Sequence, residues 1–273
     1  MQISKKETVF NVRVLATDLD GTLIPLPDRP ENAEDLKRLS ACLAEAEREL
    51  VFCTGRHFES VIEALDDFGL PRPNWMICGV GSALYRREGK DYVRFAPFYD
   101  HLAEKTGHVD REGIQDLLSD LQGLTLQCAA HQGEYKISYD CAAEDLDRLL
   151  TEIDRRLTAG SYPFRSMGSV DPFTDGGLID LLPEGVTKAY TLAWLSTHGD
   201  FHPDEVVYAG DSGNDLAALT HGFRAILVGN AAEDLRQAVR KTLSEKGLDA
   251  CLYCAQGAAS SGVLEGCRHF GLI

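Results

Sequence analysis

Two carboxylates one residue apart follow an apolar run in LATDLDGTLI, residues 15–24. If residues 12–18 form a parallel strand, Asp18 and Asp20 lie at its carboxyl end, where open α/β sheets bind their ligands. Gly21 permits a turn and a close approach of the backbone. A hard divalent cation such as Mg²⁺, held by oxygen ligands, would offset the repulsion between the two charges. Asp and Gly are also common in solvated turns, so this motif alone leaves both interpretations open.

Two further segments have residues suited to an anion. In ELVFCTGRHF, Thr54 and Gly55 stand where a predicted strand runs into a predicted helix. A hydroxyl and free N–H groups at a helix start can bind phosphate, although Thr54 could equally be a helix N-cap. In EGVTKAYTLAWL, Lys188 stands near a helix start, where the dipole favours negative charge. That location indicates an anionic partner, although an exposed helix lysine is the commoner case.

A second acidic segment, VVYAGDSGNDLAAL, has Asp211 at the end of a predicted strand and Asp215 four residues later. Both could face one metal ion if the loop between them bends back toward the first carboxylate pair. The alternative is an ordinary loop in which Asp215 caps the following helix.

The elements that would position these residues follow from the hydrophobic pattern. Strand-like apolar runs alternate with amphipathic helical runs up to residue 80 and again after residue 184, which is typical of βαβ units and a parallel sheet. Between about residues 83 and 183 the pattern changes to hairpin-like pieces and two helices. We therefore predict an α/β fold with a Rossmann-like core at 1–83 and 184–273 and an inserted α+β domain at 84–183.

Composition limits the kind of partner. The 273 residues have a formal net charge of −16 and no basic run, which argues against nucleic-acid binding. No segment approaches the roughly 20 apolar residues of a membrane span, and no signal-like segment precedes the first motif, so we expect a cytoplasmic protein, either a monomer or a weak homodimer. The eight cysteines are scattered. Cys251 and Cys254 form one pair that could bind metal, but packing is the favoured interpretation.

In order, DLDGT, TGR, Lys188 and GDSGND resemble the motifs of the haloacid dehalogenase (HAD) superfamily of aspartyl-phosphate-forming phosphotransferases, and the resemblance covers nearly the whole chain. It implies a Mg²⁺ cofactor. Asp18 would be the nucleophile that attacks phosphorus, and Asp20 the general acid and later the base. The metal ligands would be Asp18, the backbone carbonyl of Asp20, and Asp211, with Asp215 in or beside that shell.

The same resemblance gives Thr54, Gly55 and Lys188 the task of holding the phosphoryl oxygens. The insertion occupies the place of the type IIB cap, which closes over the core and selects the substrate. Within that subfamily, the segments HQGEYKISYD and LIDLLPEGVTKAYTLAWL most resemble sucrose-phosphate phosphatases and related sugar-phosphate phosphatases.

The candidates for substrate contact are less sharply defined. They are Ser82 together with Gln132, Lys136 and Tyr139 of the insertion. The odd spacing of Lys136 and Tyr139 puts them on opposite faces of a strand, so at most one face points into the cleft. Ser82 and Ala83 stand where sucrose phosphatases typically have a Thr-Glu pair. A mannosyl- or glucosyl-conjugate phosphate therefore remains an alternative to sucrose 6-phosphate.

The predicted function is Mg²⁺-dependent hydrolysis of a small sugar phosphate through an aspartyl-phosphate intermediate. One alternative is a broad-specificity hexose-phosphate phosphatase of the same superfamily. Two others are a receiver-like signalling module phosphorylated on Asp and a catalytically silent sugar-phosphate-binding protein. Receiver modules have their acidic pair and acceptor Asp on separate strands, and they lack both DxDGT and a cap of this size. Loss of catalysis is disfavoured because all four motifs are intact.

Overall fold

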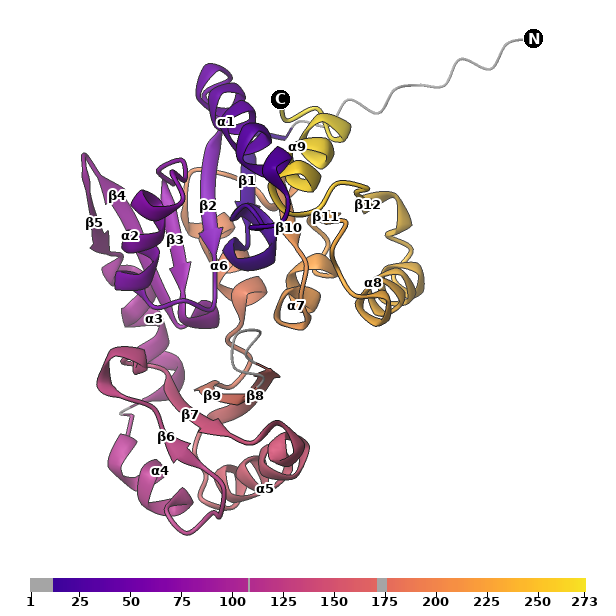
Figure 1. Cartoon of the computed structure of the whole chain (residues 1–273). Helices are drawn as coiled ribbons and strands as arrows, with labels where there is room; N and C mark the ends of the chain where they lie inside the picture. Colours follow the sequence, from indigo (N-terminus) through magenta and orange to yellow (C-terminus); the bar gives the residue numbers. More distant parts are fainter. Residues whose placement is uncertain (1–11, 108, 171–175) are drawn as a thin grey trace. The chain divides into compact units, whose positions relative to one another are not determined.

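The computed structural model describes residues 12–107, 109–170 and 176–273 (Figure 1). The chain divides into two compact units. The first comprises Met1–Phe52, Ala64–Asn74 and Ala193–Ile273, and the second comprises Cys53–Glu63 and Trp75–Leu192. Two helices, α2 (Phe58–Asp67) and α6 (Lys188–His198), have residues in both units. Because the units are defined by compactness and not by chemical role, the predicted core and cap boundaries stay a prediction.

Five parallel strands form the sheet of the first unit, in the order β12-β11-β10-β1-β2. These strands are β1 (Val14–Thr17), β2 (Glu49–Cys53), β10 (Val206–Gly210), β11 (Arg224–Leu227) and β12 (Leu252–Cys254). Strands β1 and β10 are buried along their whole length, as continuous apolar strands of a parallel sheet must be. Because β2 and β10 flank β1 on opposite sides, the strand order reverses between β1 and β10. Ligands bind at such a switch point.

The helices of the first unit bury apolar faces against this sheet and against each other. They include α1 (Pro30–Glu45), α7 (Leu216–Leu219), α8 (Glu233–Glu245) and α9 (Ala259–His269). Helix α1 starts with Pro30 in its first turn and buries Leu36, Leu39 and Leu43, a spacing of three to four residues. Helices α1 and α9 lie side by side (Figure 1).

The second unit begins with the antiparallel strands β3 (Trp75–Cys78), β4 (Ala83–Glu88) and β5 (Asp91–Arg94), followed by α3 (Ala96–Thr106). A four-stranded antiparallel sheet follows, in the order β6-β7-β9-β8. Its strands are β6 (Thr125–Leu126), β7 (Ile137–Cys141), β8 (Phe164–Val170) and β9 (Gly177–Pro183).

Helices α4 (Arg111–Leu118) and α5 (Leu146–Ala159) pack on one face of the four-stranded sheet (Figure 1). Ile137 and Ile179 belong to the apolar core that they cover. Since side chains alternate along a strand, the residues between these apolar positions face away from the helices. The described residues between 83 and 183 contain three α-helices, α3, α4 and α5, where two helices were expected. Of the three, α3 has the weakest amphipathic pattern and is therefore the hardest to predict from the sequence.

The predicted fold class is confirmed: the protein is a mixed α/β molecule with a dominant parallel sheet and an additional α+β region. All eight cysteines lie in described segments and none of them forms a disulfide bond. Cys53, Cys78 and Cys267 are buried, as expected for packing residues. Across the described segments, no helix has both the length and the apolar character that a bilayer crossing requires.

Candidate active site

Asp18 directly follows β1 and is buried. Its amide donates to the carbonyl of Ala209 on β10 at 2.9 Å, which fixes the carboxyl end of β1 against its neighbour. One carboxylate oxygen accepts from the amide of Leu19 at 2.8 Å. Gly21, three residues on, has a φ of +72°, and its carbonyl accepts from Asn230 at 2.8 Å. The chain therefore turns at the glycine, as its residue type predicts.

Three of the predicted acids come together. Oxygen atoms of Asp18, Asp211 and Asp215 all lie within 4.8 Å of one another. Two unit charges of like sign about 4 Å apart repel by about 4 kcal/mol at an effective dielectric constant of about 20. Such a cluster of hard oxygen donors at a switch point fits a divalent cation, and Mg²⁺ suits it because carboxylates are its usual protein ligands.

Hydrogen bonds hold the two later acids in place. Asp215 is fully buried, accepting from the Tyr208 hydroxyl at 2.6 Å and from the amides of Asp211 and Ser212, both at 3.1 Å. Asp211 accepts from the Thr22 hydroxyl at 2.6 Å. These contacts aim the carboxylates before any cation binds, as residues behind a metal site do. Asp20 lies in the same turn as Asp18 but is partly exposed and outside the three-residue cluster.

The predicted phosphate-binding residues lie in the second unit. Thr54 is buried, and its hydroxyl accepts from the amide of Arg56 at 3.1 Å. Helix α2 starts only at Phe58, and the ring of His57 accepts from the amide of Ser60 at 3.3 Å. His57 therefore caps α2, and the interpretation of Thr54 as its N-cap is wrong. Gly55 follows in the same turn.

Lys188 is the first residue of α6 and is fully buried. The alternative of an exposed helix lysine is therefore wrong. A buried ammonium needs negative charge or several acceptors near it. The dipole is positive at the start of a helix, so it supplies none of the negative charge that the ammonium needs. This position is therefore suited to an anion that contacts both the ammonium and the helix end.

A turn that the sequence motifs did not single out connects these two segments. Residues Gly79–Ser82, the GVGS turn, follow β3 and have three successive positive φ angles, 55° at Gly79, 59° at Val80 and 108° at Gly81. The Val80 amide donates to the carbonyl of Thr54 at 3.0 Å, and the Gly81 carbonyl accepts from Thr191 of α6 at 2.6 Å. In the sequence, two glycines separated by one residue directly after an apolar run, Gly79 and Gly81, are the pattern that indicates this turn.

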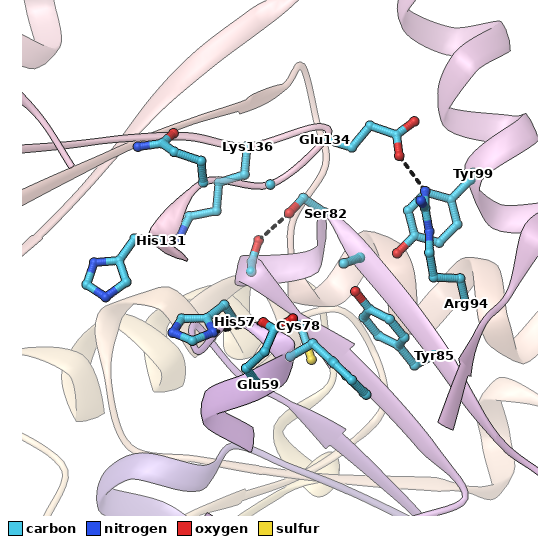
Figure 2. A pocket seen from close by; sticks show the side chains of 15 residues that line it. His57, Glu59, Cys78, Ser82, Tyr85, Arg94, Tyr99, His131, Glu134 and Lys136 are labelled. Carbon is cyan, nitrogen blue, oxygen red and sulfur yellow. Dashed lines mark hydrogen bonds and ion pairs between the residues drawn. The ribbon is translucent and has the colours of Figure 1, made fainter. Parts of the chain in front are cut away.

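A cavity of about 220 Å³ opens within the second unit above the GVGS turn (Figure 2). It is lined by the first turn of α2, by β3 and β4 with the turn between them, by β5 and α3, and by the loop 131–136 before β7. The predicted substrate-contact residues Ser82, Gln132 and Lys136 all line it.

Aromatic and charged groups form one wall of this cavity. The rings of Phe58 and Tyr85 stack at 4.2 Å between centroids. The Arg94 guanidinium lies over the ring of Tyr99 at 3.8 Å and pairs with Glu134 (Figure 2). Burial raises the pKa of both tyrosines, so each keeps its proton and can donate a hydrogen bond. Aromatic faces beside polar groups can bind a ligand with both apolar and hydroxylated surfaces.

Two candidates of the insertion have structural partners of their own. Gln132 accepts from the amide of Ser138 at 3.0 Å and donates to the carbonyls of Gln127 and Ser138, so its amide braces the loop. Tyr139 lies in the apolar core beneath α4 and α5, on the opposite face from Lys136. The prediction that Tyr139 contacts the substrate is therefore wrong, because side chains alternate along β7 and that of Tyr139 points away from the cavity. Burial raises its pKa to about 12.

Comparison with known proteins finds a matching family and relatives that are phosphatases or related hydrolases. The sucrose-6F-phosphate phosphohydrolase family matches residues 11–271. A mannosylfructose-phosphate phosphatase of Agrobacterium fabrum is 30% identical over 262 residues, covering 96% of this chain and 98% of that protein. A HAD-like hydrolase of Nitrosococcus oceani is 32% identical over 266 residues, covering 94% of this chain and 71% of that protein.

Among solved structures, the sucrose-phosphatase of Synechocystis sp. PCC6803, in complex with sucrose and phosphate, superposes with a TM-score of 0.74. It is 26% identical and covers 94% of this chain and 97% of that chain. The family match spans both acidic segments, the TGR turn, Lys188 and the whole insertion between them. The chain therefore belongs to the sucrose-6F-phosphate phosphohydrolase family and is a phosphatase of the HAD superfamily.

Proposed function

We propose that this protein is a Mg²⁺-dependent phosphomonoester hydrolase acting on sucrose 6-phosphate or a related glycosyl-conjugate phosphate. The observation that supports this most is the buried cluster of Asp18, Asp211 and Asp215 at the carboxyl ends of β1 and β10. The names of the relatives, a mannosylfructose-phosphate phosphatase and a sucrose-phosphatase, favour a glycosylated sugar phosphate. The predicted cytoplasmic location and monomeric or weakly dimeric state stay predictions.

In this proposal the carboxylate of Asp18 attacks phosphorus and displaces the sugar alkoxide, forming an acyl phosphate on its own side chain. Asp20 donates a proton to that alkoxide and then takes one from the water that hydrolyses the acyl phosphate. Asp18, the Asp20 carbonyl, Asp211 and Asp215 would hold Mg²⁺, which when bound neutralises charge on the transferring phosphoryl group.

Thr54, Gly55 and Lys188 hold the remaining phosphoryl oxygens in the same proposal. The buried ammonium of Lys188 and the amides of the TGR turn are suited to this, because phosphoryl transfer depends mainly on positioning and charge stabilisation. The GVGS turn supports it, since its hydrogen bonds to Thr54 and Thr191 link the two segments.

The cavity above the GVGS turn would receive the sugar. Ser82 and Lys136 supply polar groups there, Gln132 lines the cavity and braces its loop, and the stacked rings of Phe58 and Tyr85 supply an apolar face. A cavity of about 220 Å³ suits one sugar ring better than a polymer. In this interpretation residues 84–183 act as the cap and residues 1–83 and 184–273 as the catalytic core.

The test is hydrolysis of a panel of phosphate esters. It comprises sucrose 6-phosphate, mannosylfructose phosphate, glucosylglycerol phosphate, glucose 6-phosphate and p-nitrophenyl phosphate, each with Mg²⁺ and with EDTA. Asp18→Asn should abolish release of phosphate from every ester, with deamidation excluded by mass spectrometry. Asp28→Asn, an exposed acid of the same unit, should behave as the wild type. Normal turnover by Asp18→Asn would refute the covalent mechanism. Equal rates on glucose 6-phosphate and on the three glycosyl-conjugate phosphates would favour the broad-specificity alternative.

A further inference from the structure

The face of the four-stranded sheet that is not covered by α4 and α5 contains a charged pair. Ser138 of β7 and Asp180 of β9 are directly opposite each other in the strand register. Their neighbours Ile137 and Ile179 point into the apolar core, so Ser138 and Asp180 point the other way. Lys136, immediately before β7, shares their face by the same alternation. Lys136 and Asp180, 44 positions apart in the chain, therefore meet on the face opposite α4 and α5.

The contacts among these residues converge on a single oxygen. The Lys136 ammonium lies 3.1 Å from Oδ1 of Asp180, and the Ser138 hydroxyl donates to the same oxygen at 2.7 Å. The side chain of Lys136 is 11% exposed and that of Asp180 is 20% exposed. An ammonium so far removed from water needs a counter-charge, because an unpaired buried charge is strongly unfavourable. Asp180 supplies that charge.

The backbone and stem of Lys136 are also held. The Arg111 guanidinium donates to the carbonyl oxygens of Gly133 and Lys136, the latter at 3.0 Å. The Lys136 stem passes close to Gly79, where a Cβ would lie 3.4 Å from its Cδ. Lys136 is thus restrained at the main chain by Arg111, along its stem by the GVGS turn, and at its tip by Asp180.

Lys136 lines the cavity, whereas Asp180 does not. A lysine ammonium has three N–H donors, and the contact to Asp180 takes one of them. The remaining donors are suited to hydroxyl oxygens of a ligand in the cavity. An ammonium that is already oriented loses little side-chain entropy when it binds such a hydroxyl.

We infer that Asp180 is a positioning residue, which fixes the Lys136 ammonium in the cavity wall so that it donates to a hydroxyl of the sugar part of the substrate. This rests on the proposed function. Asp180 acts only through Lys136, so its removal should weaken recognition of the sugar and leave phosphoryl transfer itself intact.

The experiment compares Asp180→Asn with the wild type on two esters, the panel sugar phosphate with the highest kcat/KM and p-nitrophenyl phosphate, which has no sugar. Asp180→Asn keeps the size of the side chain and an acceptor for Ser138 but removes the charge. We expect KM for the sugar phosphate to rise about tenfold or more with kcat within about twofold, the range for losing a charged hydrogen bond in binding. Hydrolysis of p-nitrophenyl phosphate should stay within about twofold of the wild type.

The matched control is Asp140→Asn, on the same strand and face as Ser138, where the carboxylate is exposed and bonds Gln127. It should leave both substrates unaffected. In a Lys136→Met background, Asp180→Asn should add less than about twofold to KM, since the group that it positions is gone. If Asp180→Asn does not fold, Asp180→Glu replaces it. The longer side chain keeps the charge but displaces the ammonium, so KM should rise about threefold.

Equal loss on both esters, or an undiminished effect of Asp180→Asn in the Lys136→Met background, would overturn the inference. So would an unchanged KM for the sugar phosphate in Asp180→Asn, or in Asp180→Glu where that variant is the one used. Failure of the proposed function is distinguishable, because the wild type would then hydrolyse none of the esters.

Discussion

Gly21 is the position where a single methyl group tests the acidic cluster most directly. Its φ is +72°, and a Cβ built there would lie 2.8 Å from Cγ of Asp211 and closer still to Oδ2. Ordinary van der Waals contact begins at about 3.4 Å, so in Gly21→Ala the Asp211 carboxylate must withdraw by about 0.6 Å or more. That movement also strains the 2.6 Å hydrogen bond from Thr22.

Two effects of the substitution can be separated by magnitude. An alanine in the left-handed region costs about 1–2 kcal/mol of stability wherever it stands. The displaced carboxylate affects only the site, and there a misplacement of about 1 Å can cost about 100-fold in rate. We therefore expect Gly21→Ala to lose about 1–2 kcal/mol in urea denaturation but roughly 30- to 100-fold in kcat with p-nitrophenyl phosphate, and to need more Mg²⁺ for half-maximal rate.

Gly247→Ala is the matched control. Its φ is +69°, almost the same as that of Gly21, and nothing lies within 4 Å of its Cβ position. The control should lose the same stability and keep its kcat and its Mg²⁺ dependence. If Gly21→Ala retained wild-type kcat while both variants were equally destabilised, Asp211 would not be a group whose position matters to the reaction.

Three other groups of the structure give defined predictions: Tyr208, the metal site and His221. Tyr208→Phe removes the 2.6 Å hydrogen bond to buried Asp215 and should cost about 1–3 kcal/mol in urea denaturation. EDTA should abolish activity and added Mg²⁺ restore it, while Asp211→Asn should weaken Mg²⁺ binding at least about tenfold in calorimetric titration. Burial of His221, with Lys246 nearby, lowers its pKa below the usual value of about 6.5. Protonation therefore favours the unfolded chain, so the free energy of unfolding should fall as pH drops through about 6.5. Denaturant titrations at about pH 5.5 and about pH 7.5 measure this fall, and His221→Gln should reduce it.

The acidic cluster could be anticipated from the sequence because it depends on local rules. A buried parallel strand is a continuous apolar run, and its carboxyl end is where polar residues reappear, so Asp18 and Asp211 were placed by β1 and β10 alone. Asp215 was left between two interpretations. The structure has features of both, because Asp215 belongs to the acidic cluster while its side chain also accepts from the Ser212 amide in a capping box of the turn at 213–215. Its hydrogen bond from Tyr208 was not predictable, since no spacing rule gives a side-chain hydrogen bond to a buried strand.

The features that escaped prediction depend on contacts between distant segments. The pair of Lys136 and Asp180 joins strands whose register is set by turns and core packing, which a single sequence does not specify. The full burial of Lys188 likewise reflects what packs around the start of α6. Tyr139 was partly predictable, because the alternation of side chains along a strand already put it on the opposite face from Lys136. The sequence did not show which of the two faces α4 and α5 cover.

The strain in the GVGS turn has a physical explanation in its neighbours. A β-branched residue with φ of 59°, as at Val80, is a genuine outlier that costs about 1–2 kcal/mol and persists only where surrounding contacts determine it. Here the Val80 amide must reach the carbonyl of Thr54 while Gly81 passes within contact distance of the Thr187 backbone. The strained turn makes both contacts, and together they hold Thr54 and the start of α6 at a fixed separation. In the proposed function Thr54 and Lys188 hold the same phosphoryl group, and that role would require the fixed separation that the turn provides.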